Sequence, residues 1–160
     1  MDIAKSREIK QFGEGRRKLL ALEKEGKYVF HGSPNVVITL EPRQGYDLNK
    51  ETGKMEKDGE PAVFATPYAD MAIFRALINT NDVSEESTSN FGINEGQLHF
   101  SATKNLLDQA KQKTGRVYVL DKQKFQDFEG MQCRSDKSIS PIEIIEVTTD
   151  DLPQNIETIK

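Results

Sequence analysis

The sequence predicts a single domain of the α+β class. Short runs of β-branched and aromatic residues, bounded by Gly or Pro, alternate with two or three amphipathic segments, and no stretch of the chain repeats. The 160 residues are enough to bury one sizeable core. We expect residues 1–26 to form an N-terminal helical extension and residues 27–160 to form a single domain.

The composition argues against several classes of protein. A single cysteine, Cys133, rules out a disulfide framework and a zinc site built from several cysteines, and only two histidines are present. The sequence contains no run of about 18 apolar residues, so no membrane span is predicted. The N-terminus lacks the apolar stretch of a secretion signal. The net charge of −4 does not predict a general nucleic-acid surface. We therefore expect a cytoplasmic protein without a metal site.

The first third of the chain predicts one helix, one strand and one long loop. Apolar residues including Leu19 form a thin stripe over 16–25, which predicts a peripheral helix; the alternative is an arm that binds a partner. A β-branched and aromatic run over 28–30 predicts a strand that stops at a turn. Residues 43–61 are polar and lack apolar periodicity, which predicts a long loop, a kind of segment that is usually functional or disordered.

The rest of the chain predicts short strands and helices. Residues 62–65 form an apolar run typical of a buried strand, and the following Thr66-Pro67 pair is a helix start signal, so a helix is expected over 67–77. The remaining expected elements are a polar loop at 80–96, a helix at 103–113, and strands at 97–100, 116–120, 132–134 and 142–147.

His31, Gly32 and Ser33 follow the first predicted strand and form the most suggestive site in the chain. Glycine at the end of a strand lets another molecule approach the backbone closely. The neighbouring histidine donates or accepts hydrogen bonds near neutral pH. On these three residues alone, the alternative is an ordinary histidine at a strand end.

Three motifs in order resemble those of the ADP-ribosyltransferase superfamily. The first is His31-Gly32-Ser33, and the second is Val63-Phe64-Ala65-Thr66, where the family has Tyr-Phe-Ala-Asp or similar. Without a gap, Ala72 and Phe74 then match the small residue and the aromatic of the family's next helix. The resemblance is to the branch shared by the poly(ADP-ribose) polymerases and the diphtheria-type toxins, and it covers residues 27–148. It implies a split β core in which two small sheets form a cleft for NAD+, with a few flanking helices.

The resemblance also implies how NAD+, as the substrate, would be held. Backbone groups of Gly32 would bind the nicotinamide amide, and His31 would bond a ribose hydroxyl. Phe74 would stack on the nicotinamide ring, and it would line the floor of the cleft together with His31. Ser33 and Phe64 belong to the first two motifs and are expected to contribute to the same binding site.

The predicted loop at residues 43–61 falls where the family has its donor loop, which covers NAD+ as a lid. Because residues 43–61 lack apolar periodicity and have few groups able to be buried, we expect the segment to be mobile until NAD+ binds. Arg43 would then neutralise the pyrophosphate, and the alternative is an arginine that is simply solvated.

The family's late-strand glutamate is replaced in this chain. That carboxylate stabilises the positive charge that develops on the ribose as nicotinamide leaves. The match puts Gln132 at this position, and glutamine accepts a hydroxyl hydrogen bond but carries no charge. Glu129, three residues earlier, is the candidate substitute. Val63 and Met71 also replace residues that help to fix nicotinamide in the family.

The resemblance implies an enzyme that transfers ADP-ribose from NAD+ to an unknown acceptor, as a toxin-like protein, a phage effector or a housekeeping transferase. A first alternative is a catalytically weakened module that binds NAD+ or ADP-ribose. A second is the RNA 2′-phosphotransferase branch, which relies on several arginines around a phosphate; here the arginines are spread along an acidic chain. A third is an interaction protein without a ligand.

Overall fold

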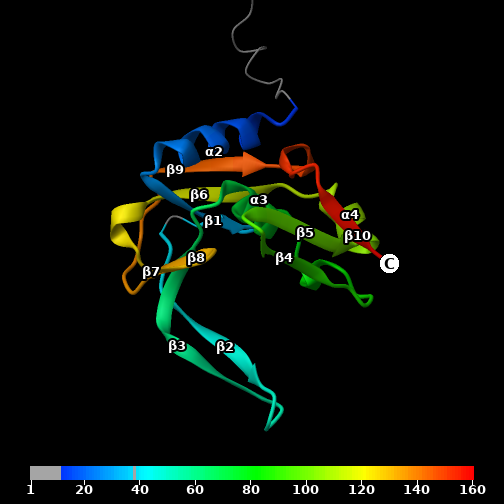
Figure 1. Ribbon diagram of the computed structural model, residues 1–160, viewed down its shortest axis with the longest axis horizontal. Helices are drawn as coiled ribbons and strands as arrows, with labels where there is room; N and C mark the ends of the chain where they lie inside the picture. The colour runs from blue at the N-terminus through cyan, green and yellow to red at the C-terminus, as the bar shows by residue number, and fades with distance from the viewer. Residues whose placement is uncertain (1–11, 38) are drawn as a thin grey trace, which may run out of the picture.

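The structure is a computed structural model that describes residues 12–37 and 39–160, and it has the predicted α+β class (Figure 1). The α-helices are α2 (Glu14–Glu25), α3 (Ala69–Leu77) and α4 (Lys104–Ala110). Short 3₁₀ turns are η1 (Thr80–Asp82), η2 (Lys122–Lys124) and η3 (Thr149–Asp151). Within the described residues, no helix is both long and apolar enough to cross a membrane.

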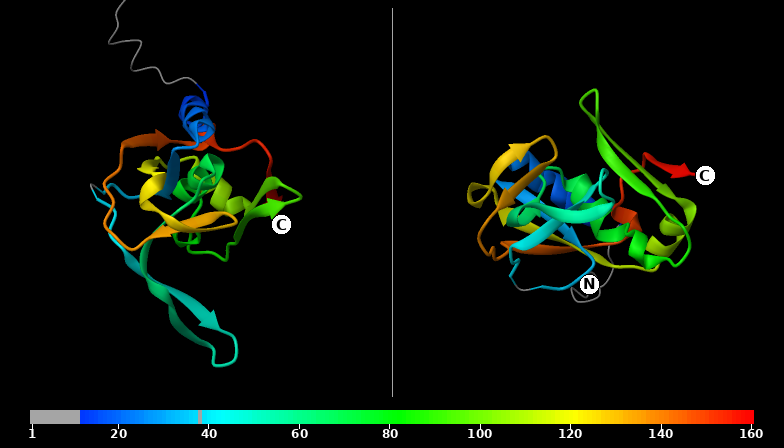
Figure 2. Two further views of the ribbon diagram at one scale, coloured as in Figure 1. Left: turned by 60° about the vertical axis from the view of Figure 1, so that its left-hand side comes forward. Right: turned by 90° about the horizontal axis from the view of Figure 1, so that it is seen from below.

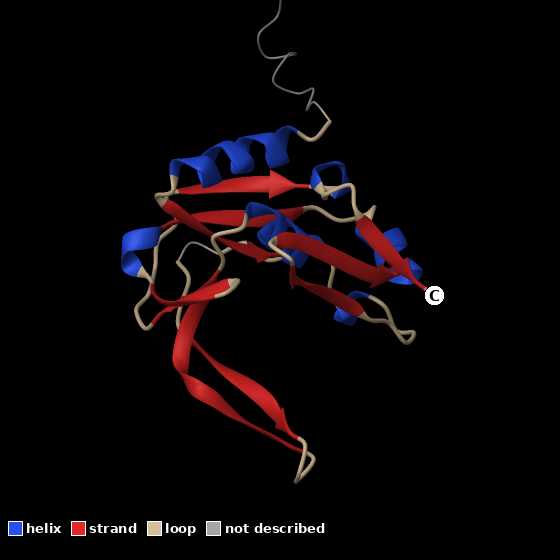
Figure 3. Ribbon diagram, viewed as in Figure 1, coloured by secondary structure: helices blue, strands red, loops and turns tan. Residues whose placement is uncertain are grey.

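The strands form three sheets in this part of the chain, where the resemblance implied two (Figure 3). The first is antiparallel, in the order β1 (Tyr28–Ser33), β6 (Gly115–Asp121), β9 (Glu143–Val147). The second has the order β10 (Ile156–Ile159), β5 (Gln97–Thr103), β4 (Ser89–Asn94). The third has the order β2 (Arg43–Asn49), β3 (Lys54–Ala65), β8 (Gln132–Ser135), β7 (Gln126–Glu129).

The first sheet separates two apolar cores, because its side chains alternate between its faces. Phe30, Val117 and Val119 belong to the core that α3 covers and that also buries Leu19 of α2. Residues of the opposite face, including Val29 and Tyr118, belong to a second core. The end of β3, strand β8 and three residues outside the strands complete this core: Leu40, Phe125 and Ile139. The sheet is thus buried on both faces.

Helix α3 lies directly against the first sheet because two glycines leave room for its backbone. A Cβ atom added to Gly32 would lie 1.8 Å from the carbonyl oxygen of Ala72, and one added to Gly115 would lie 2.6 Å from that of Ala76. No side chain fits at either distance. Gly32 was predicted to admit a ligand, and the structure shows that it first of all admits the helix.

Helix α2 is tied to the domain at both of its ends. At its start, the backbone N–H of Arg16 donates to the carboxylate of Asp151 (3.0 Å). Near its end, the Glu23 carboxylate accepts from the N–H of Ala69 (2.6 Å), which caps α3. The predicted helix at 16–25 is therefore present, begins two residues earlier, and packs on the domain. The first part of the predicted 1–26 extension, residues 1–11, lies outside the described residues.

The prediction of a loop at residues 43–61 is wrong, because this segment forms the β2–β3 hairpin. The hairpin extends away from the body of the molecule (Figures 1 and 2). Backbone hydrogen bonds between two strands need no apolar side chains, so a hairpin that packs on little else carries no apolar periodicity. Residues 43–61 thus have regular strand structure without a ligand, which contradicts the expectation of an unstructured lid.

Other differences lie at polar surface elements. The predicted loop at 80–96 contains η1 and β4, and neither β7 nor β10 was predicted. Helix α3 begins at Ala69 rather than at Pro67. The buried elements, including β5, β6 and β9, lie close to the predicted positions because their apolar residues face a core.

We expect the substitution Gly32→Ala to destabilise the protein by about 1–3 kcal/mol or more, since the added methyl group meets the backbone of α3. Urea denaturation followed by circular dichroism measures the change in the free energy of unfolding. Gly92→Ala is the matched control, because its added Cβ would meet only the side chain of the exposed His99. A Gly32→Ala protein as stable as the wild type would contradict this packing.

Candidate functional site

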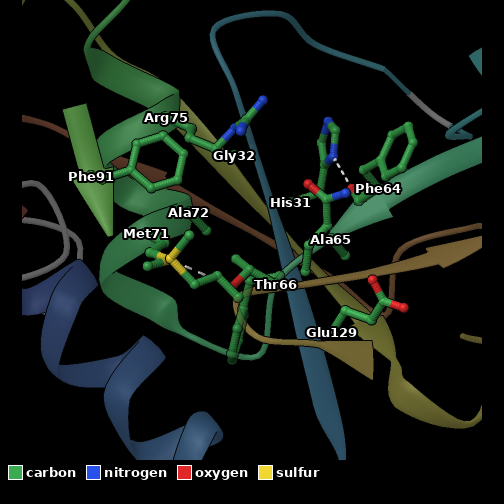
Figure 4. A pocket seen from close by; sticks show the side chains of 13 residues that line it. His31, Gly32, Phe64, Ala65, Thr66, Met71, Ala72, Arg75, Phe91 and Glu129 are labelled. Carbon is green, nitrogen blue, oxygen red and sulfur yellow. Dashed lines mark hydrogen bonds between the residues drawn. The ribbon is translucent and has the colours of Figure 1, made fainter. Parts of the chain in front are cut away.

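A single bridge joins β1 to the residue that follows β3, and a pocket lies beside this bridge (Figure 4). The backbone N–H groups of Phe30 and Thr66 each donate to the other's carbonyl oxygen, at 2.8 and 2.9 Å. The pocket beyond this bridge has a volume of about 260 Å³. It is lined from β1 by Phe30, His31 and Gly32, from the end of β3 by Phe64, Ala65 and Thr66, from α3 by Met71, Ala72 and Arg75, from β4 by Phe91, and from the β7–β8 hairpin by Glu129, Met131 and Gln132.

One hydrogen bond fixes the ring orientation and the neutral tautomer of His31. Its Nδ1 lies 2.7 Å from the carbonyl oxygen of Phe64, and a carbonyl only accepts, so Nδ1 carries the hydrogen. Burial lowers the pKa of His31 below its ordinary value of 6.5, the bond to Phe64 opposes this shift, and the charges of Arg75 and Arg43 add to it. The ring is therefore neutral near pH 7, and Nε2 is left as a hydrogen-bond acceptor.

The aromatic wall of the pocket is Phe91, not Phe74. Phe74 is 1% exposed and packs in the core, with its ring centroid 5.1 Å from that of Phe100 and 5.9 Å from that of Phe91. On a helix, residues 71, 72 and 75 share one face, whereas residue 74 points about 100° away from residue 75. The expectation that Phe74 lines the cleft floor with His31 is therefore wrong for this structure, and Phe74 instead supports Phe91 from behind.

Glu129 and Gln132 both line the pocket. They pair with each other across the β7–β8 hairpin, whose turn contains Gly130 in the left-handed conformation (φ 59°). Both side chains are exposed. The hairpin thus brings the two candidate residues to the same wall of the pocket. The carboxylate of Glu129 is the one carboxylate in the pocket lining.

The arginines that are spread along the sequence partly gather around this pocket. Arg75 lines it, and Arg43 is exposed on β2, near enough for its charge to act on His31. The guanidinium of Arg134 lies 5.8 Å from the ring centroid of Phe64. Arg116, by contrast, pairs with Glu146 (3.6 Å). The wide sequence spacing of the arginines is therefore no argument against a phosphate-binding role.

Besides Phe74, two further predicted cofactor-binding residues, Ser33 and Arg43, do not line the pocket. The hydroxyl of Ser33 accepts from the N–H of Asn35 (3.1 Å) and so stabilises the turn after β1. Four lining residues were missed as site residues: Phe91, Arg75, Met131 and Phe30. An aromatic residue in a polar segment, and the single cation within the apolar run of α3, are the signals that could have indicated the first two.

We expect His31 to titrate below pH 6.5 in the folded protein and to carry its neutral-state hydrogen on Nδ1. Between the lowered pKa and 6.5 the unfolded chain binds more protons, so the stability that neutral His31 contributes is complete above pH 6.5 and is lost as the pH falls through the folded pKa. Nuclear magnetic resonance of the ring nitrogens measures both properties, with His31→Gln to assign the signals. A midpoint at or above 6.5, or a hydrogen on Nε2, would contradict the assignment.

Comparison with known proteins identifies no relative. No protein-family model, no curated protein and no solved structure matches the chain. In the described part of the chain, no group of three or more His, Cys, Asp or Glu residues is placed to hold a metal ion. The functional inference therefore starts from the residues of the pocket: a neutral histidine, an aromatic wall, one carboxylate and one guanidinium.

Proposed function

We propose that the pocket binds the nicotinamide–ribose end of NAD+ and that the protein transfers ADP-ribose from NAD+ to an acceptor, with release of nicotinamide. One observation carries the proposal: His31, with a free acceptor nitrogen, and the carboxylate of Glu129 line the same small pocket from different strands. The three-motif resemblance to the ADP-ribosyltransferases supports the identity of the ligand.

The backbone of β1 supports recognition of a carboxamide. Successive residues of a strand direct their N–H and C=O groups to opposite sides. Phe30 directs its groups to Thr66 at the bridge with β3. Gly32, two residues later, therefore presents its N–H and C=O on the same side, where β3 has turned away and the pocket opens. One donor and one acceptor side by side match the two polar atoms of the nicotinamide amide.

The side chains of the pocket supply the remaining contacts. Phe91 and Met71 offer apolar surface to a flat ring, and an aromatic pair contributes about 0.5–1.5 kcal/mol beyond area burial. Nε2 of His31 accepts a hydrogen bond from a ribose hydroxyl. Because the ring of His31 is fixed by Phe64, this acceptor is already in place before the ligand arrives.

The proposed chemistry breaks the bond between nicotinamide and ribose. The bonding electron pair leaves with nicotinamide, and positive charge develops on the ribose ring. The carboxylate of Glu129 stabilises this charge, which exists in the transition state more than in bound NAD+. A nucleophilic atom of the acceptor then forms the new bond to the ribose and releases its proton. Gln132 orients a sugar hydroxyl beside Glu129.

A second candidate function is a module that binds NAD+ or ADP-ribose without turnover. The burial of Phe74, which leaves it inaccessible to a ligand, favours this candidate. So does the resemblance, which puts Gln132 at the position of the family's glutamate. Binding depends on shape and hydrogen bonds, so it survives both differences. Catalysis depends on charge, so it is the property that Gln132 weakens.

The two candidates separate when NAD+ is added and nicotinamide release is measured by chromatography, together with the change in melting temperature. We expect Glu129→Gln to slow release at least about tenfold, or about 1.4 kcal/mol, while NAD+ affinity stays within a few fold. We expect Gln132→Glu to speed release by at least about tenfold, because it adds a carboxylate at the same wall.

Glu51→Gln, at the tip of the β2–β3 hairpin, is the matched control for loss of a carboxylate and is expected to leave release unchanged. Stabilisation by NAD+ without nicotinamide release would favour the binding module. Release that is unaffected by Glu129→Gln would exclude the role given to this carboxylate. Neither stabilisation nor release would exclude both candidates and leave an interaction protein.

A further inference from the structure

Arg75 is a cation in the pocket without an acidic partner among the described residues. Its guanidinium lies 5.6 Å from the ring centroid of Phe91, and no carboxylate or carbonyl oxygen of the described chain hydrogen-bonds it. Nearby protein atoms displace water from the guanidinium, which lowers the pKa of Arg75 below its ordinary value. The residue as a whole is nevertheless exposed to solvent. An arginine remains charged under these conditions. Its five donors are therefore available to a ligand.

The fold holds this guanidinium in place. Arg75 follows Ala72 by three residues on the face of α3 that lines the pocket, and α3 is fixed against β1 by the close contact at Gly32. The ring of Phe91 supports the guanidinium from one side. In Figure 4 the side chain of Arg75 extends from α3 across the pocket toward His31. A charge that is positioned in this way loses little freedom when a ligand binds.

The other charged groups nearby do not neutralise Arg75. Glu129 lines the same pocket but forms no ion pair with it. Arg43 adds a second positive charge near His31. Arg134 is already engaged, since its guanidinium donates to the carbonyl oxygen of Glu60 (2.9 Å) and lies 4.0 Å from the carboxylate of Asp127. Arg75 and Arg43 thus both place positive charge near His31, and Glu129 is the one carboxylate of the pocket lining.

We propose that Arg75 binds a phosphoryl group of the ligand, so that the pocket selects molecules that join a flat ring and sugar to a phosphate. The planar guanidinium fits two oxygens of a phosphate in a bidentate arrangement. The second positive charge from Arg43 favours a phosphate over a singly charged carboxylate. The identity of the ring rests on the proposed function, whereas the binding of a phosphoryl group does not. The phosphate belongs either to the nicotinamide nucleotide itself or to a separate acceptor.

The test is isothermal titration calorimetry with nicotinamide riboside, which lacks a phosphate, nicotinamide mononucleotide, which carries one, and inorganic pyrophosphate. We expect the wild type to bind the mononucleotide at least about tenfold more tightly than the riboside. Arg75→Gln should remove this difference and leave riboside affinity within a few fold. Arg75→Lys, which keeps the charge and loses the bidentate geometry, should lie between the two.

Lys104→Gln is the control for loss of a surface cation, because Lys104 lies on α4 and pairs there with Asp108. It should change none of the affinities, and circular dichroism checks that each variant is folded. Pyrophosphate is also titrated into protein saturated with the mononucleotide. If pyrophosphate still binds the saturated protein and this binding depends on Arg75, Arg75 binds a phosphate separate from the nucleotide. If the mononucleotide abolishes pyrophosphate binding, Arg75 binds the phosphate of the nucleotide.

The outcomes distinguish this inference from the proposed function. If the riboside and the mononucleotide bind equally well and Arg75→Gln changes neither, the role of Arg75 is overturned and nicotinamide recognition stands. If the riboside does not bind but pyrophosphate binds through Arg75, nicotinamide recognition fails and the phosphate site stands. If none of the three compounds binds, both are overturned.

Discussion

The close approach of α3 to the first sheet is the contact on which the pocket depends. Gly32 and Gly115 bring the backbone of the helix to a distance that no side chain allows. The contact buries α3 almost completely, and seven of its nine residues are buried. Because Gly32 also lines the pocket, the position that sets the distance between helix and strand is part of the pocket wall. Any displacement of α3 therefore changes the shape of the site directly.

The same contact fixes which side chains of α3 reach a ligand. With its backbone held at Ala72 and Ala76, the helix has one rotational setting, and this setting turns Met71, Ala72 and Arg75 to the pocket. Phe74 is then directed into the core, where it packs on Phe100. The aromatic surface of the pocket comes from β4 instead. A motif match along the sequence identified the correct helix, but it could not give the helix rotation.

The sequence predicted the parts of the fold that bury apolar side chains. The strands around Val29 and Val117 and most of α3 lie where expected, since core positions leave a periodic signal. The β2–β3 hairpin and β7 were missed because they are held by backbone hydrogen bonds at a polar surface. The site was predicted in part for the same reason. The motif residues His31 and Gly32 and the two β7–β8 residues converge on the pocket, whereas tertiary contacts bring in Arg75 and Phe91, and their only local signals are a lone cation and a lone aromatic residue.

The cap at the start of α2 has a consequence for the order in which the chain becomes structured. The N–H of Arg16 is bonded by Asp151, 135 positions later in the sequence. In a nascent chain, the N–H of Arg16 therefore gains this partner only when nearly all of the chain has been synthesised. Contacts over such long sequence separations slow the folding of a domain, because the intervening chain must be closed into a loop first. The turn η3 thus supplies a hydrogen-bond acceptor to the start of α2, so these two distant segments must meet before this cap forms.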